Sequence, residues 1–197
     1  MKTLLILLCF IPILTYSQEY TEVVDVPGKT AGQLYSAARE WFAKSYITAE
    51  NPLLMDDRIA GKIIAKGSIH VIESYLPSEF ADVPVLIVWY PNFTIIVSVK
   101  DGKYKNEITD ISITTGVGEN NPGTTEPFKE YFDKKDFYQK RSDPEWFITT
   151  EKIGKAAAFR SAQPNKAAYN LISKTETEMK DLLAKLQQEM KKTEDNW

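Results

Sequence analysis

Two alternating segments joined by Asp101-Gly102 constrain the fold more than any other feature of the sequence. In the segment 85–100 apolar side chains recur at alternate positions, and the segment 103–115 begins directly after the dipeptide. Such alternation is typical of half-buried strands, and Asp-Gly between two of them predicts a tight hairpin with a type I′ turn. The chain should therefore contain a long antiparallel hairpin.

Each strand of this hairpin carries an expected irregularity. Pro91-Asn92 is a candidate interruption of the first strand, because proline cannot donate a backbone hydrogen bond. In the second strand the apolar phase changes between Ile108 and Ile111, which predicts a β-bulge. The next segment, 116–125, is rich in glycine and asparagine, and we expect it to form a loop.

The segment 62–73 alternates as well, and it predicts a single strand with two different faces. Shorter strands are expected at 20–26 and 53–57, the first of which ends at a Pro-Gly turn. The apolar face of 62–73 would carry Ile63, Ala65, Gly67, Ile69 and Val71. The more polar face would carry Lys62, Ile64, Lys66, Ser68, His70 and Ile72.

Helices are expected mainly in the second half of the chain. Thr30 and Gln33 form a capping box that should begin a helix over 31–46, directly after the first strand. Short helices are expected over 127–139 and from Asp143 onward, because Asp143-Pro144 is a good helix start. Apolar residues at helical spacing over 165–192 predict a long amphipathic helix, which would begin after the break expected at Pro164.

This order of elements predicts an α+β fold. A β-α-β-β-β-β core followed by helices favours an antiparallel sheet that is covered by helices on one face. We expect a single domain over 18–197, made of a strand and helix unit at 18–115 and of loop and helices at 116–197.

Residues 1–17 have the layout of a secretory signal peptide: a positive charge, a short apolar run and small residues near the end. Cleavage would leave an exported chain that is periplasmic or extracellular and has no transmembrane segment. Its only cysteine, Cys9, would be lost, and with it any disulfide, thiolate nucleophile or cysteine metal ligand. Lipid attachment at Cys9 is the alternative, but the bulky Leu8 disfavours it.

Charge and motifs exclude several functions. The formal net charge is −3, and loss of Lys2 would make it −4, which disfavours nucleic acid and anionic membranes. Gly28-Lys29-Thr30 lacks the first glycine of a phosphate loop. His70 is the only histidine, so a multi-histidine metal site is impossible. We expect no cofactor and no metal.

Two further groups of residues are interpreted as structural. Asp56 and Asp57 are neighbours on a strand and should point to opposite faces, which rules out a shared carboxylate site. A set of aromatic residues could line a ligand groove, although packing in the core is the favoured interpretation. This set comprises Trp41, Phe42, Tyr46, Trp89, Tyr90 and Phe93.

Several blocks resemble a secreted bacterial family of unknown function with a TATA-box-binding-protein-like fold. They are 20–28, 34–35, 39–42, 60–68, 99–104 and the ending Asp195-Asn196-Trp197. The resemblance covers residues 19 to about 115, and it implies a curved sheet and export, with no established activity to transfer. It does not imply DNA binding, because a shared fold is only an analogy.

The leading functional hypothesis is a non-catalytic module that binds a protein, peptide or glycan of the cell envelope. Lys62, Lys66, Ser68 and His70 on the more polar strand face are its candidate binding residues. The alternative is a secreted hydrolase with a site built from distant acids such as Asp110, Glu119 and Asp133. Nucleic-acid binding through the sheet is the third and least favoured interpretation.

Overall fold

The structure is a computed structural model that describes residues 19–45, 53–76, 83–118 and 121–192. The expected leader, Tyr46 and the closing Asp-Asn-Trp lie outside the described residues. The elements follow the order β1 (Tyr20–Asp25), α1 (Ala31–Ser45), β2 (Leu53–Asp57), β3 (Lys62–Ser68), β4 (Val71–Tyr75), β5 (Val85–Lys100), β6 (Lys103–Gly118), β7 (Asn121–Pro127), α2 (Phe128–Phe132), α3 (Lys135–Arg141), α4 (Pro144–Thr150) and α5 (Lys155–Lys191).

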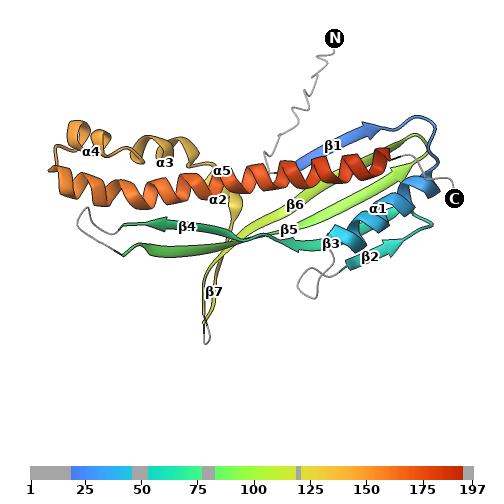
Figure 1. Cartoon of the computed structure of the whole chain (residues 1–197), viewed down its shortest axis with the longest axis horizontal. Helices are drawn as coiled ribbons and strands as arrows, with labels where there is room; N and C mark the ends of the chain where they lie inside the picture. Colours follow the sequence, from blue (N-terminus) through green and yellow to red (C-terminus); the bar gives the residue numbers. More distant parts are fainter. Residues whose placement is uncertain (1–18, 46–52, 77–82, 119–120, 193–197) are drawn as a thin grey trace, which may run out of the picture.

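The hairpin of β5 and β6 forms the centre of an antiparallel sheet (Figure 1). On the side of β5 away from β6, β4 pairs with the first half of β5 and β3 pairs with its second half. β2 then pairs with β3. On the free side of β6, β1 pairs with the first half and β7 with the second. The α+β class, the antiparallel sheet and the long C-terminal helix are confirmed.

The expected bulge is present in β6. Asn92 pairs with Ser112 and Thr94 with Thr109, so two steps along β5 oppose three along β6. Asp110 is the extra residue, and its φ of 53° is positive. Beyond this point the hairpin of β6 and β7 leaves the body of the molecule (Figure 1). The expected loop over 116–125 is therefore wrong, because its described residues extend β6 and form β7.

Pro91 does not interrupt β5, which is continuous from Val85 to Lys100. The break falls instead on the neighbouring strand, so the single strand expected over 62–73 is wrong and is replaced by β3 and β4. Ile69 donates its N–H to the Pro91 carbonyl oxygen at 3.0 Å, but Pro91 has no N–H to return. Ser68 pairs with Asn92 and Val71 with Trp89, so the register and the two faces continue across the gap.

The turn between β5 and β6 is tight, but it is not type I′. A type I′ turn needs positive φ at both of its central residues. Gly102 has a φ of 74°, but the φ of Asp101 is not positive. Asp101 has another role, because its carboxylate accepts the Ala31 N–H at 2.7 Å at the start of α1. The capping box beside it is confirmed by the bonds between Thr30 and Gln33.

Helices α1 and α5 pack on the same face of the sheet (Figure 1). Their apolar faces meet the alternating apolar positions of the central strands in one core. Its fully buried members include Leu34, Phe42, Ile63, Phe93, Ile95, Ile108, Leu171, Ile172 and Leu186. The aromatic residues Trp41, Phe42, Trp89 and Phe93 belong to this core, as expected, but Tyr90 does not, because it alternates with Trp89 and lies on the opposite face of β5.

Helix α5 begins ten residues before the predicted start and runs through Pro164. Asn165 donates its side-chain amide to the Ser161 carbonyl oxygen at 2.8 Å in the turn that proline disturbs. The early part of α5 packs with α4 around a small second core that contains Phe147, Ala158 and Ala162. The helix expected over 127–139 is two helices, α2 and α3. Among the described residues, no helix is both long and apolar enough to cross a membrane.

Candidate binding face

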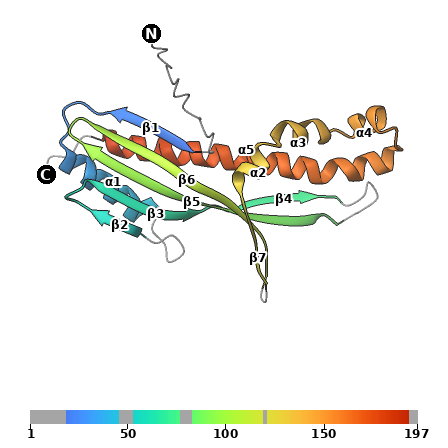
Figure 2. The same cartoon turned by 180° about the vertical axis from the view of Figure 1, so that it is seen from behind.

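The sheet has a second face, which none of the described helices covers. From behind, β3 and β5 pass in front of α1 (Figure 2). Strand alternation places on this face the residues that the core does not use. We call it the open face, and its residues are Lys62, Ile64, Lys66, Ser68, Tyr90, Asn92, Thr94, Ile96, Ser98, Lys105, Glu107, Thr109, Ser112 and Thr114, with Asp110 at the bulge.

A hydrogen-bonded chain crosses the middle of the open face. Lys66 donates from Nζ to Thr94 Oγ1 at 2.8 Å, and the Thr94 hydroxyl donates to Asp110 Oδ2 at 2.9 Å. Thr94 is buried, with 5% of its surface exposed, while Lys66 and Asp110 are exposed. A hydroxyl both donates and accepts, so Thr94 connects an ammonium to a carboxylate from β3 to β6.

The bulge turns the Asp110 side chain toward Thr94 and so makes this hydrogen-bonded chain possible. A regular strand would place residue 110 one step out of phase with residue 94, since successive side chains point to opposite faces. The extra residue and the positive φ of 53° bring its carboxylate within bonding distance of both Thr94 and Thr109. The sequence indicated a bulge but not this role for Asp110.

A second group of hydrogen-bonded polar side chains lies next to the chain of Lys66, Thr94 and Asp110. The Asn92 side-chain amide donates to Thr114 Oγ1 and to the Tyr90 carbonyl oxygen, each at 2.9 Å. Thr114 Oγ1 lies 2.8 Å from Thr125 Oγ1 on β7. Ser68 pairs with Asn92 in the β-ladder and therefore borders this group. The polar side chains thus continue across four strands.

The structure brings together three of the four predicted binding residues. Lys66, Ser68 and His70 follow one another along the same side of β5, and the His70 ring packs edge-to-face on Tyr90 with centroids 4.9 Å apart. Lys62 lies apart from them, beyond the apolar pair Ile64 and Ile96. As binding residues, all four stay predictions.

Charges of both signs lie on the open face. Lys62, Lys66 and Lys105 are among its lysines, Lys100 and Lys103 follow on the same face beside the turn, and Lys105 forms a 2.7 Å ion pair with Glu107. Glu107, Asp110 and Asp57, the strand partner of Lys62, supply the opposite charge. A face of this kind favours hydrogen bonding over attraction to a strongly charged polymer.

The acids of the alternative hydrolase hypothesis have separate partners. Asp110 is bound to Thr94, and Asp133 at the end of α2 pairs with Lys129. Glu119 lies outside the described residues. Among the described residues there is also no group of three His, Cys, Asp or Glu side chains that could hold a metal ion.

Asp56 and Asp57 point to opposite faces, as expected. Asp57 accepts the N–H groups of Ile59 and Ala60 in the following turn at 2.9 and 2.8 Å. Asp56 faces α1, where it accepts hydrogen bonds from the Tyr35 hydroxyl and, at 2.7 Å, from Arg39 Nε. These two bonds lower the pKa of Asp56, Tyr35 first and Arg39 second. Burial, followed by the bond to Asp56, raises the pKa of Tyr35 to about 12.

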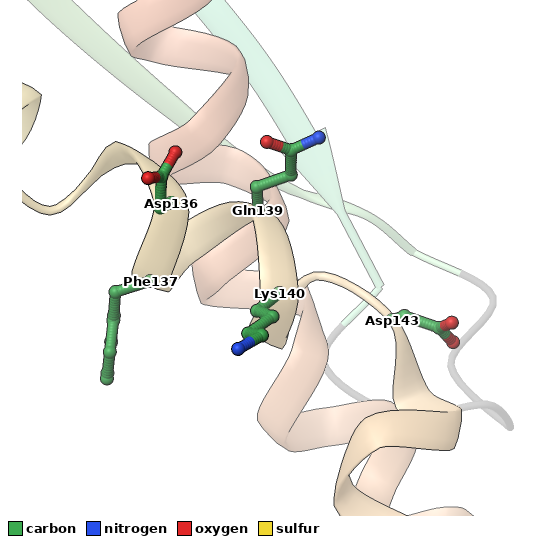
Figure 3. Close-up of a pocket in the computed structure, with 5 residues that line it drawn as sticks. All are labelled: Asp136, Phe137, Gln139, Lys140 and Asp143. Atoms are coloured by element: carbon green, nitrogen blue, oxygen red, sulfur yellow. The ribbon is translucent and has the colours of Figure 1, made fainter.

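A hollow also lies beside α3, but the side chains that line it do not converge on one point. It has a volume of about 740 Å³ and is lined by Asp136, Phe137, Gln139, Lys140 and Asp143. Figure 3 shows these side chains pointing in different directions from α3 and the start of α4. Asp143 is already used, since it accepts the Glu145 N–H at 2.9 Å as the helix cap. The hollow therefore has no convergent set of ligand groups.

Comparison with known proteins identifies the fold. Residues 20–114 match a family described as a domain of unknown function (DUF4468) with a TBP-like fold. No curated protein matches the chain.

Two solved structures are similar to the chain. A DUF4468 family protein from Bacteroides ovatus is 14% identical, with a TM-score of 0.50 over 90% of this chain and 88% of that one. A TBP-like protein from Parabacteroides distasonis is 13% identical, with a TM-score of 0.43 over 86% of this chain and 92% of that one. Residues 20–114 are therefore similar to the DUF4468 family, which is described as a domain of unknown function with a TBP-like fold.

Proposed function

We propose that this chain is an exported, non-catalytic module that binds a protein, peptide or glycan of the cell envelope through its open face. One observation carries the proposal: Lys66, Thr94 and Asp110 form a bonded chain at the centre of a polar sheet face. These bonds hold the polar groups in fixed positions, so a partner would meet a preorganised surface.

The chemistry of the face supports a polar partner without a strong net charge. Its lysines and carboxylates are mixed, and hydroxyl and amide groups from Ser68, Asn92 and Thr114 lie among them. Such groups both donate and accept hydrogen bonds, which suits a peptide backbone or the hydroxyls of a glycan. The His70 and Tyr90 rings add an apolar border on which part of a partner can pack.

The bonds within the face also support binding over catalysis. A general acid or base has to be within reach of a substrate proton and have a pKa suited to its task. Asp110 is held by Thr94 and Thr109, and the sole histidine packs against an aromatic ring. These groups are arranged to hold the surface in shape.

The test is capture of partners from an envelope extract by the immobilised chain, residues 18–197. Ser68→Arg would place a long charged side chain at the middle of the open face. It should lower the amount of captured material at least tenfold. The matched control is Thr177→Arg, at an exposed position on α5, which should capture as the wild type does. Equal capture by the two variants would contradict the proposal.

Export has its own test. Intact-mass measurement of the protein purified from its native host should give a chain that begins at Gln18. A mass that includes Met1 or Cys9 would contradict cleavage of the leader. The sequence of the leader supports this part of the proposal, and the described residues have no bearing on it.

A further inference from the structure

A small pocket lies on the other side of the sheet, between α1 and the edge strand β2. Its volume is about 340 Å³, and it is lined by Tyr35, Ser36, Arg39, Asp56 and Arg58. Because Asp56 faces α1, this pocket is separate from the open face and from any partner bound there.

Both oxygens of the carboxylate in the pocket already accept a hydrogen bond. One oxygen of Asp56 accepts from the Tyr35 hydroxyl and the other from Arg39 Nε at 2.7 Å. Tyr35 is itself buried, with 5% of its surface exposed, and so it fixes the position of Asp56. Asp56 in turn orients the Arg39 guanidinium, whose two terminal amino groups are not used in this bond.

The second guanidinium comes from a rigid turn. Arg58 directly follows β2, in a turn that Asp57 closes by accepting two N–H groups. Gly61 ends the turn with a φ of 63°, and its carbonyl oxygen accepts the Val99 N–H at 2.8 Å. A Cβ at residue 61 would meet the Val99 carbonyl oxygen at 3.0 Å, so the backbone of this turn is closely fitted to β5.

The residues that line the pocket therefore include two arginines, Arg39 and Arg58, and one carboxylate that is already bonded. Within the described part of the chain, no acidic side chain forms an ion pair with Arg58. A planar guanidinium binds carboxylate and phosphate oxygens through two parallel hydrogen bonds.

We propose that this pocket binds the oxyanion group of a ligand, either a carboxylate or a phosphate monoester, between Arg58 and the free amino groups of Arg39. Asp56 and Tyr35 position Arg39, and they do not touch the anion. The site goes beyond the proposed function, because no residue of the open face contributes to it.

The test is titration of residues 18–197 with inorganic phosphate and, separately, with acetate. Binding is followed by backbone amide NMR shifts at neutral pH and constant ionic strength, with chloride as the reference anion. Saturable shifts confined to α1 and the turn after β2 are expected. A response to phosphate alone indicates a phosphate monoester, and a response to acetate as well indicates a carboxylate.

Two variants test the assignment to this pocket. Arg58→Gln should weaken binding about tenfold or more, since it removes a charge-assisted pair. Ser36→Glu, at an exposed position on α1, should abolish binding because it adds a carboxylate to the pocket. Arg160→Gln on α5 is the matched control and should bind as the wild type does.

Unsaturable shifts, or unchanged binding by both pocket variants, would overturn the proposal. Ser68→Arg on the open face should leave phosphate binding intact, so failure of this site and failure of the proposed function are distinguishable. Amide spectra that match the wild type away from the pocket would show that each variant is folded.

Discussion

Ile69 donates its backbone N–H to the Pro91 carbonyl oxygen at 3.0 Å and receives no bond in return. One missing donor therefore divides a continuous line of side chains into β3 and β4, although the register on either side is the same. The two strands also lie over different helices: β3 contacts α1, and β4 contacts α5. Pro91 thus marks the point where the two halves of the sheet meet.

Pro91→Ala would restore the missing donor opposite Ile69. We expect a protected amide at residue 91 in hydrogen exchange, because its new N–H would face the Ile69 carbonyl oxygen. The net change in stability should be within about 1 kcal/mol, since the greater entropy of the unfolded chain opposes the added bond. Exchange at residue 91 as fast as in an exposed loop would contradict this account of the break.

The bulge can be tested at Asp110. Asp110→Val should destabilise the fold by about 2 kcal/mol in urea unfolding, because a β-branched residue is strained at positive φ and the bond to Thr94 is lost. Asp110→Gly loses the same bond without the strain and should cost about half as much. Equal losses for the two variants would show that the backbone conformation contributes nothing.

Much of the fold could be predicted from local pattern. The hairpin, the bulge, the capping box and the long amphipathic helix all rest on residues close together in sequence. The errors in the turn type and in the position of the break have non-local causes. Asp101 binds the start of α1, and Pro91 interrupts the line of β3 and β4 beside it but not its own strand, β5. β7 was missed because glycine and asparagine are frequent in the segment 116–125, which is typical of a loop, while its pairing with β6 depends on threonines across the ladder.

The candidate face was predicted only in part, for the same reason. Period-two alternation places Lys66, Ser68 and His70 on one face, but it does not identify the residues beside them on β5 and β6. Thr94 and Asp110 become neighbours only when the strand register and the bulge are known. The pocket of Arg39 and Arg58 depends on the packing of α1 against β2, which no spacing in the sequence encodes.

A cluster between α3 and α4 should stabilise the smaller core. The Arg141 guanidinium lies 4.3 Å from the Trp146 ring centroid and 4.7 Å from that of Phe137, and it pairs with Glu151 at 2.9 Å. Arg141→Ala should therefore cost about 1–2 kcal/mol. Hydrogen exchange should accelerate in α4 and leave β5 unchanged, because the two cores are separate. Arg160→Ala is the control, and faster exchange in β5 would contradict the separation.

The bonds to Asp56 make stability depend on acidity. Its pKa is lowered in the folded chain, first by the Tyr35 hydroxyl and then by Arg39, so the ionised form is favoured by folding. This contribution is present above the unfolded pKa of about 4 and is lost as the pH falls through the lower folded value. Asp56→Asn should therefore unfold more easily than the wild type at neutral pH, and the difference should shrink toward about pH 3. Urea unfolding at several pH values measures this difference, and a gap that stays constant across the range would show that Asp56 is not held ionised by its partners.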